Sequence, residues 1–111
     1  MQRMRFSLFR QVWRLVFVPR SKLYDRRRKE QLDGVCAVPQ HPGHVLTEVQ
    51  RVIHLRNDLD DEDLMESVIH ELGHAAFPDT QEAYVEHFAR DTMRLLMRLG
   101  FHRKECDDDA S

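Results

Sequence analysis

The chain has 111 residues, of which 41% are hydrophobic and 32% are charged, and this composition is ordinary for a single soluble globular domain with one modest core. The longest apolar runs are only a few residues long, which argues against a membrane-spanning helix. Cys36 and Cys106 are two isolated cysteines that do not make a disulfide framework, so a cytoplasmic location is the simpler expectation.

The net charge of −2 conceals a strong asymmetry along the chain. Residues 1–30 contain ten Lys or Arg against two acids, a balance of +8, whereas residues 31–111 contain seven against seventeen acids, a balance of −10. The densest basic cluster, residues 26–29, could contact nucleic acid. A solvated loop is the favoured interpretation, because no aromatic residue is interleaved with these cations.

The N-terminal part is predicted to form a strand hairpin, because apolar and polar residues alternate at positions 4–9 and 12–18. Pro19 ends the second strand, and residues 20–44 form a long polar connection. We expect this connection to contain a short element of its own or to form part of a substrate cleft. Its Cys36, His41 and His44 fit no zinc-module spacing, so we interpret them as loop residues rather than as a second metal site.

Residues 49–55 alternate as a third strand, with His54 either on the strand surface or next to an active site. The acids at positions 58–63 then indicate the N-terminus of a first helix, because negative side chains are favourable at the positive end of the helix dipole. Pro78 is expected to end this helix. Asp79 or Thr80 is predicted to cap a second helix that runs to about Leu99. The expected fold is therefore α+β: a small antiparallel sheet packed on a two-helix hairpin, in one domain spanning residues 1–104, with a flexible acidic tail at 105–111.

Residues 70–74 read His-Glu-Leu-Gly-His, the HExxH pattern. Two histidines four residues apart differ by only about 40° around a helix axis, so His70 and His74 can bind one zinc ion together. Glu71 can reach a water on that metal without taking a coordination position. The apolar positions of the same helix point almost opposite to the histidines, which argues against buried core histidines. These positions are Leu64, Met65, Val68, Leu72, Ala75 and Ala76. Two solvated histidines on a polar face are the alternative interpretation.

A catalytic zinc needs three protein ligands and one open position. In the second helix, Glu82 lies about 70° from the centre of the apolar stripe and Glu86 about 110°. Glu82 is therefore favoured as the third ligand, with Glu86 or another residue as alternatives. Glu82 also completes a capping-box-like pattern with Asp79, in which its carboxylate would bond back to the cap amide instead.

The HELGH sequence followed by a helix with Glu82 and Glu86 resembles the gluzincin branch of the zinc metallopeptidases. The resemblance implies that Glu82 is the zinc ligand and that Glu86 orients a histidine ligand and raises its basicity. The layout of residues 4–102 is also similar to small, single-domain, zincin-like metallopeptidases. In that comparison the sheet edge next to the metal helix, expected here at residues 49–55, receives the substrate backbone as an added strand.

The expected function is zinc-dependent hydrolysis of a peptide or protein substrate, with Glu71 as the general base. Tyr24, Tyr84 and His102 are the candidates for a second group that stabilises the oxyanion. Two other interpretations stay open. One is a binding or regulatory protein on the same scaffold with little protease activity. The other is a nucleic-acid-associated protease, resembling SprT-like or ImmA/IrrE-type enzymes, with the basic N-terminal half as the tether.

Overall fold

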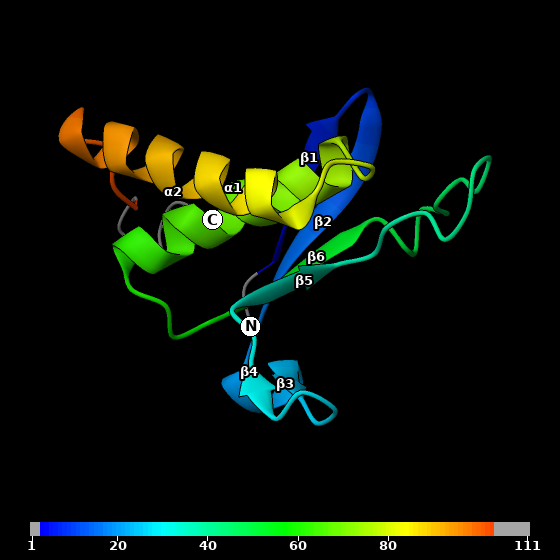
Figure 1. Cartoon of the computed structure of the whole chain (residues 1–111), viewed down its shortest axis with the longest axis horizontal. Coiled ribbons are helices and arrows are strands. Elements are labelled where there is room, and N and C mark those ends of the chain that lie inside the picture. The colour runs from blue at the N-terminus through cyan, green and yellow to red at the C-terminus, as the bar shows by residue number, and fades with distance from the viewer. Residues whose placement is uncertain (1–2, 104–111) are drawn as a thin grey trace.

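The computed structural model describes residues 3–103, and it is an α+β fold with a four-stranded mixed sheet and two helices (Figure 1). A separate two-stranded hairpin lies to one side of this sheet. The elements are β1 (Arg3–Leu8), β2 (Gln11–Val18), a 3-10 turn η1 (Arg20–Leu23), β3 (Tyr24–Asp25), β4 (Glu30–Gln31), β5 (Gly34–Cys36), β6 (Val52–Arg56), α1 (Asp61–Ala76) and α2 (Glu82–Arg98). The helix α1 packs against the sheet, and α2 packs against α1.

The N-terminal hairpin of β1 and β2 forms as predicted, with Phe6 paired to Trp13 and Met4 paired to Leu15. The turn lies one residue earlier than expected. Phe9 and Arg10 occupy it with φ of 49° and 64°, which is the left-handed geometry that a two-residue hairpin turn uses.

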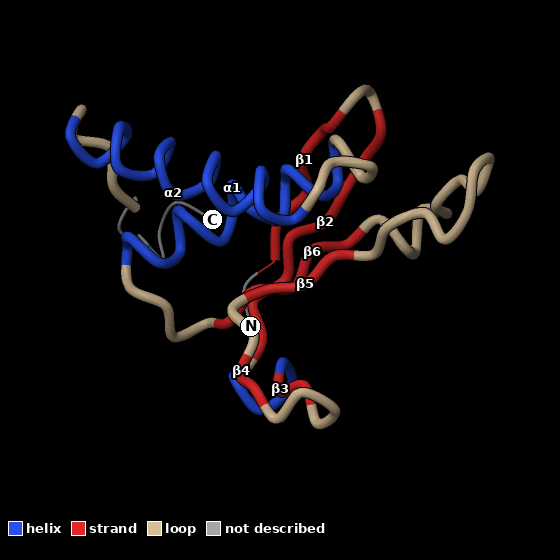
Figure 2. The backbone as a smooth tube through the Cα atoms, viewed as in Figure 1, coloured by secondary structure: helices blue, strands red, loops and turns tan. Residues whose placement is uncertain are grey.

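The sheet is mixed, so the prediction of an antiparallel sheet is wrong. Its strand order is β1-β2-β6-β5, and β6 runs parallel to β2, with Leu15 opposite Ile53 and Phe17 opposite Leu55. The long connection after Pro19 explains this direction, because it returns the chain to the starting end of β2 before β6 begins. Figure 2 shows the last part of the connection, residues 37–51, extending away from the sheet as a loop.

The edge strand beside α1 is β5, not the strand predicted at residues 49–55. That strand starts later, at Val52, because the Thr47 carbonyl accepts hydrogen bonds from the amides of Gln50 and Arg51, and this turn takes residues 47–50. It is also internal, since β5 pairs with its other side in antiparallel register. The long connection therefore contains short elements of its own, which was one of the two expectations for it.

The core lies between the sheet and α1. Side chains alternate across each strand, so Leu15, Phe17, Ile53 and Leu55 all point to the helix side, together with Trp13. From α1, the predicted apolar stripe supplies the partners that pack against this cluster, namely Leu64, Val68, Leu72 and Ala75. This packing fixes the rotation of α1 about its axis, and so it also fixes where the opposite face of the helix points.

The two helices form the predicted hairpin, but the second helix begins differently from the prediction. α1 is capped by Asp60, whose carboxylate accepts a hydrogen bond from the Asp63 amide at 2.8 Å. The N-cap of α2 is Gln81, without a side-chain capping bond, so neither Asp79 nor Thr80 caps this helix. The reason is a turn after Pro78, in which the Thr80 amide donates to the Phe77 carbonyl at 3.0 Å and delays the helix start.

Within residues 3–103, neither helix combines the length and apolar character needed to cross a bilayer. The acidic tail predicted at residues 105–111 lies outside the described residues.

Candidate metal centre

The two histidines of the HExxH pattern lie on the face of α1 that turns away from the core. Their Nε2 atoms are 3.0 Å apart, and the rings meet edge to face with an interplanar angle of 68°. Both side chains are about one-fifth exposed, 21% for His70 and 19% for His74. They are therefore neither core histidines nor freely solvated ones, and a small ion could reach both Nε2 atoms.

Glu82, the first residue of α2, completes the group. One carboxylate oxygen lies 2.9 Å from His70 Nε2 and the other lies 2.8 Å from His74 Nε2. Its carboxylate thus points at the histidines and not back at a capping amide, so the capping-box alternative is wrong. Among the residues that the structure describes, this is the group of three that could hold a metal ion, with all ligand atoms within 4.8 Å of one another.

The close approach of the two helices brings Glu82 to this position. A Cβ atom added at Gly73 would lie 3.0 Å from Val85 Cγ1, so the missing side chain lets the first turns of α2 pack against the last turns of α1. Val85 is buried in this contact, one turn after Glu82. Glu82 therefore lies on the side of α2 that faces His70 and His74.

The donor set fits a zinc ion in chemistry and nearly in geometry. Two imidazoles and one carboxylate are a common ligand set of catalytic zinc, with bonds of about 2.0–2.2 Å. Tetrahedral ligands at such distances lie about 3.3 Å apart, whereas the present separations of 2.8–3.0 Å are those of hydrogen bonds. Each histidine contacts a different oxygen of Glu82, and with one donor atom per residue the three atoms lie within 4.8 Å of one another. The side chains would therefore have to shift to place all three donors around one ion.

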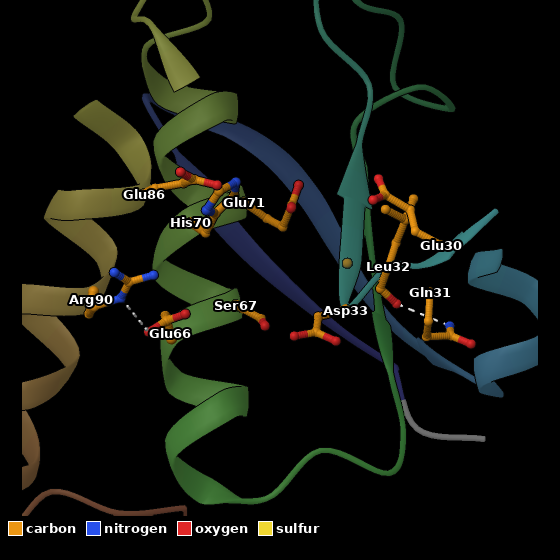
Figure 3. A pocket seen from close by; sticks show the side chains of 11 residues that line it. Glu30, Gln31, Leu32, Asp33, Glu66, Ser67, His70, Glu71, Glu86 and Arg90 are labelled. Carbon is orange, nitrogen blue, oxygen red and sulfur yellow. Dashed lines mark hydrogen bonds and ion pairs between the residues drawn. The ribbon is translucent and has the colours of Figure 1, made fainter. Parts of the chain in front are cut away.

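Glu86 lies one turn beyond Glu82 and is exposed. Figure 3 places its side chain near His70, but no hydrogen bond or ion pair between Glu86 and either histidine occurs within residues 3–103. Glu82 is thus the carboxylate that converges with the histidines. The orienting role that the resemblance implies for Glu86 stays a prediction.

Glu71 is the buried acid of the site, with 7% of its surface exposed. It points away from the core into the space between α1 and β5 (Figure 3). Burial raises the pKa of its carboxyl, while the neighbouring His74 and the Cys36 thiol act in the opposite direction. Cys36 lies on β5 with its Sγ 3.6 Å from the Glu71 carbonyl oxygen, and burial together with the Glu71 charge raises the thiol pKa to about 12.

A cleft of about 300 Å³ opens where Glu71 points. Residues 30–34 form one wall, α1 forms the floor with Ser67, His70 and Glu71, and α2 contributes Glu86 and Arg90. Residues of the long connection therefore line a cleft beside the candidate metal ligands, and its use by a substrate stays a prediction. Sequence reasoning did not single out Asp33, Ser67 or Arg90, since nothing in their local pattern indicates a cleft.

The other residues considered from the sequence lie elsewhere. Tyr84 lines a separate apolar pocket with Phe77 and Phe88, and neither Tyr24 nor His102 lines the cleft in the described part of the chain. His54 lies on the sheet face opposite α1, because its neighbours Ile53 and Leu55 point towards the helix.

The possible second metal site does not form within residues 3–103. His41 and His44 stack on each other in the loop after β5, with ring centroids 5.1 Å apart, and Cys36 contacts the Glu71 carbonyl instead.

Comparison of the chain with models of known protein families, with curated proteins and with solved structures found no match. The geometry of the His70, His74 and Glu82 group is therefore the basis for any functional argument.

Proposed function

We propose that this chain is a zinc-dependent metallopeptidase of the zincin-like type. The observation that carries the proposal is the convergence of His70, His74 and Glu82 at 2.8–3.0 Å, with the buried Glu71 next to them at a cleft. Both histidines use Nε2 towards the common point. Two imidazoles, one carboxylate and an adjacent non-ligand glutamate form one of the arrangements that zinc enzymes use to hydrolyse amides.

Each residue has a separate task in this proposal. Zinc held by the three ligands would supply the Lewis acid that lowers the pKa of a water and polarises the scissile carbonyl. Glu71 accepts the proton of the attacking water and donates it to the nitrogen of the leaving amine. Because Glu71 is buried against β5 and faces the cleft, it meets the reacting atoms on the substrate side of the ligands.

The edge strand β5 offers a way to hold an extended peptide. One side of β5 pairs with β6, and its own length of three residues limits an added strand to a few backbone hydrogen bonds. This short strand lies next to Glu71, since a Cβ at Gly34 would be 3.2 Å from Glu71 Cγ. A peptide paired with β5 would therefore pass close to the general base.

The test measures zinc content and peptide cleavage on the same protein samples. The purified full chain is loaded with zinc, its metal content is measured by mass spectrometry, and cleavage is followed on denatured casein and on a mixed peptide library. Glu71→Gln should keep its zinc and lose at least about 100-fold in turnover. Glu62→Gln, on the exposed first turn of the same helix, should cleave as the wild type does. Equal cleavage by Glu71→Gln would remove the proposed role of that residue.

Bound zinc without any cleavage would instead favour the second candidate, a binding or regulatory protein on this scaffold.

A third candidate, a nucleic-acid-associated protease, is favoured by the tip of the β3–β4 hairpin. Residues 26–29 are four consecutive exposed cations on this projecting hairpin (Figure 1). The Asp25 carboxylate accepts hydrogen bonds from the amides of Arg27 and Arg28 at 2.9 and 3.2 Å, which orders the backbone of the tip. DNA affinity that falls steeply between about 50 and 200 mM salt would support this candidate. No binding at the lower salt concentration would exclude it.

A further inference from the structure

The cleft beside the candidate metal ligands continues along α1 towards the N-terminus of that helix. Asp33, just before β5, points across the opening towards Ser67 on α1, and Glu66 and Arg90 lie at the α2 side (Figure 3). A substrate that reaches Glu71 would place the next part of its chain in this space. The residues around it can therefore act on the side chains that flank the scissile bond.

The lining of the cleft is strongly negative. Five acids line it, Glu30, Asp33, Glu66, Glu71 and Glu86, against the single cation Arg90. The acids and the arginine of the lining sum to a formal charge of −4, which is five acids less one arginine. A chamber with walls of one sign concentrates ligands of the opposite charge.

Neighbouring cations reduce this charge without cancelling it. Arg56 pairs with Asp33 at 3.0 Å and Arg28 lies 3.8 Å from Glu30, and counting both leaves −2. Glu66 lies 3.9 Å from Arg90, which the count already includes. A divalent ion held by Glu82 would add one net positive charge, +2 for the ion less one for the carboxylate. The surroundings remain negative after that addition.

Glu71 places a further carboxyl group at the floor of the cleft. The Glu71 residue is 7% exposed and its carboxyl points into the opening, where it interacts with the Cys36 thiol and with His74. The Cys36 thiol beside it is only a weak donor. Leu32 and Gly34 are the apolar residues of the lining, so a large apolar side chain would bury these acids without compensation. A long cationic side chain would compensate them.

We propose that the acidic cleft selects peptides with a lysine or arginine side chain next to the scissile bond. This inference rests on the proposed peptidase function and names its substrate class. The cleft volume of about 300 Å³ is at the lower end of small-ligand pockets, which suits one extended side chain. The flexible stem of Lys or Arg reaches from a backbone paired with β5 to the acids on α1.

The test compares matched peptides that differ only by Arg or Gln at the positions flanking the cleavage site. With the zinc-loaded full chain, we expect kcat/KM to be at least about tenfold higher for the Arg peptide. Glu66→Gln should reduce this ratio several-fold, because it removes a charge from the cleft wall without touching the ligands or Glu71. Glu62→Gln, one turn earlier on α1 and outside the cleft lining, should keep the wild-type ratio.

Binding is measured in parallel so that the two proposals can fail separately. The zinc-loaded Glu71→Gln variant is titrated into each fluorescent peptide, and anisotropy should show tighter binding of the Arg peptide by a margin that shrinks with salt. Cleavage or binding without an Arg preference would overturn the inference and leave the peptidase proposal intact. No cleavage of any peptide by the wild type would overturn the peptidase proposal, and the binding ratio would then decide whether the cleft prefers cations.

Discussion

Gly34→Ala tests how tightly β5 is packed against α1 and the buried core. A Cβ atom at this position would lie 2.6 Å from Leu55 Cδ2, 3.1 Å from the His54 carbonyl oxygen and 3.2 Å from Glu71 Cγ. Leu55 is fully buried at 0% exposure, so it has little room to move. Overpacking of this kind lowers the free energy of unfolding by about 1–3 kcal/mol. Replacing glycine also reduces the conformational entropy of the unfolded chain, which raises the free energy of unfolding by about 0.4–1 kcal/mol. We expect a net loss of roughly 1–2 kcal/mol in the free energy of unfolding.

The assay is urea unfolding followed by the fluorescence of Trp13, which is the single tryptophan of the chain and is 3% exposed in the core. Val35→Ala is the matched control, because it changes the next residue of the same strand, where the side chain is 41% exposed. It should cost no more than about 0.5 kcal/mol. If Gly34→Ala is as stable as the wild type, β5 does not pack against Leu55 and Glu71 as closely as described.

Three further predictions concern the ligands, one ion pair and the thiol. Glu82→Ala should lower zinc affinity by more than about 100-fold and Glu86→Ala by about tenfold at most; competition with a chromophoric chelator measures both, and the reverse order would transfer the ligand assignment to Glu86. Arg56 donates hydrogen bonds of 2.9 and 3.0 Å to Asp58, which lowers the pKa of that carboxyl below 3.8 in the folded state. This stabilisation is present above the unfolded pKa and is lost as the pH falls through the folded value. Arg56→Gln should therefore flatten the fall in unfolding free energy as the pH drops from about 5 to below 3.8. An unchanged pH profile would contradict this assignment. With a pKa of about 12, Cys36 should react slowly with iodoacetamide at about pH 8 in the folded protein and rapidly in guanidinium chloride. Peptide mapping by mass spectrometry reads out the modification, and rapid labelling of the folded chain would contradict the burial of this thiol.

The helical hairpin with the candidate ligands could be predicted from the sequence because its determinants are local. The spacing of His70 and His74 places both histidines on one face of α1, and the apolar stripe defines the opposite face, which packs on the core. Pro78 sets the C-terminal end of this helix. The angular position of Glu82 on α2 then pointed to the carboxylate that lies beside the two histidines in the folded chain. Its competing role as a capping residue failed because the turn after Pro78 moves the N-cap to Gln81.

The direction of β6 and the existence of β5 could not be predicted in the same way. A parallel pair such as β2 and β6 has no turn that joins its strands, so its register depends on how the long connection folds. β5 has only three residues and begins with Gly34, which by itself indicates a turn. Its position depends on residues far along the chain, because β5 pairs with β6 and Gly34 lies close to Leu55 and Glu71.

Glu71 therefore lies where two kinds of contact come together, the contact between the two helices and the contact between α1 and β5. The three candidate ligands come from one hairpin of adjacent helices, so their convergence needs only the contact between α1 and α2 at Gly73 and Val85. The cleft needs the sheet as well, because Asp33 and β5 form the wall that faces Glu71. Loss of β5 pairing would then leave the ligands together but expose Glu71 and remove the acidic wall opposite it. The proposed metal binding and the proposed substrate selection therefore depend on different parts of the fold. The first depends on contacts near in sequence, and the second depends on contacts between β5 and a helix that begins 25 residues after it ends.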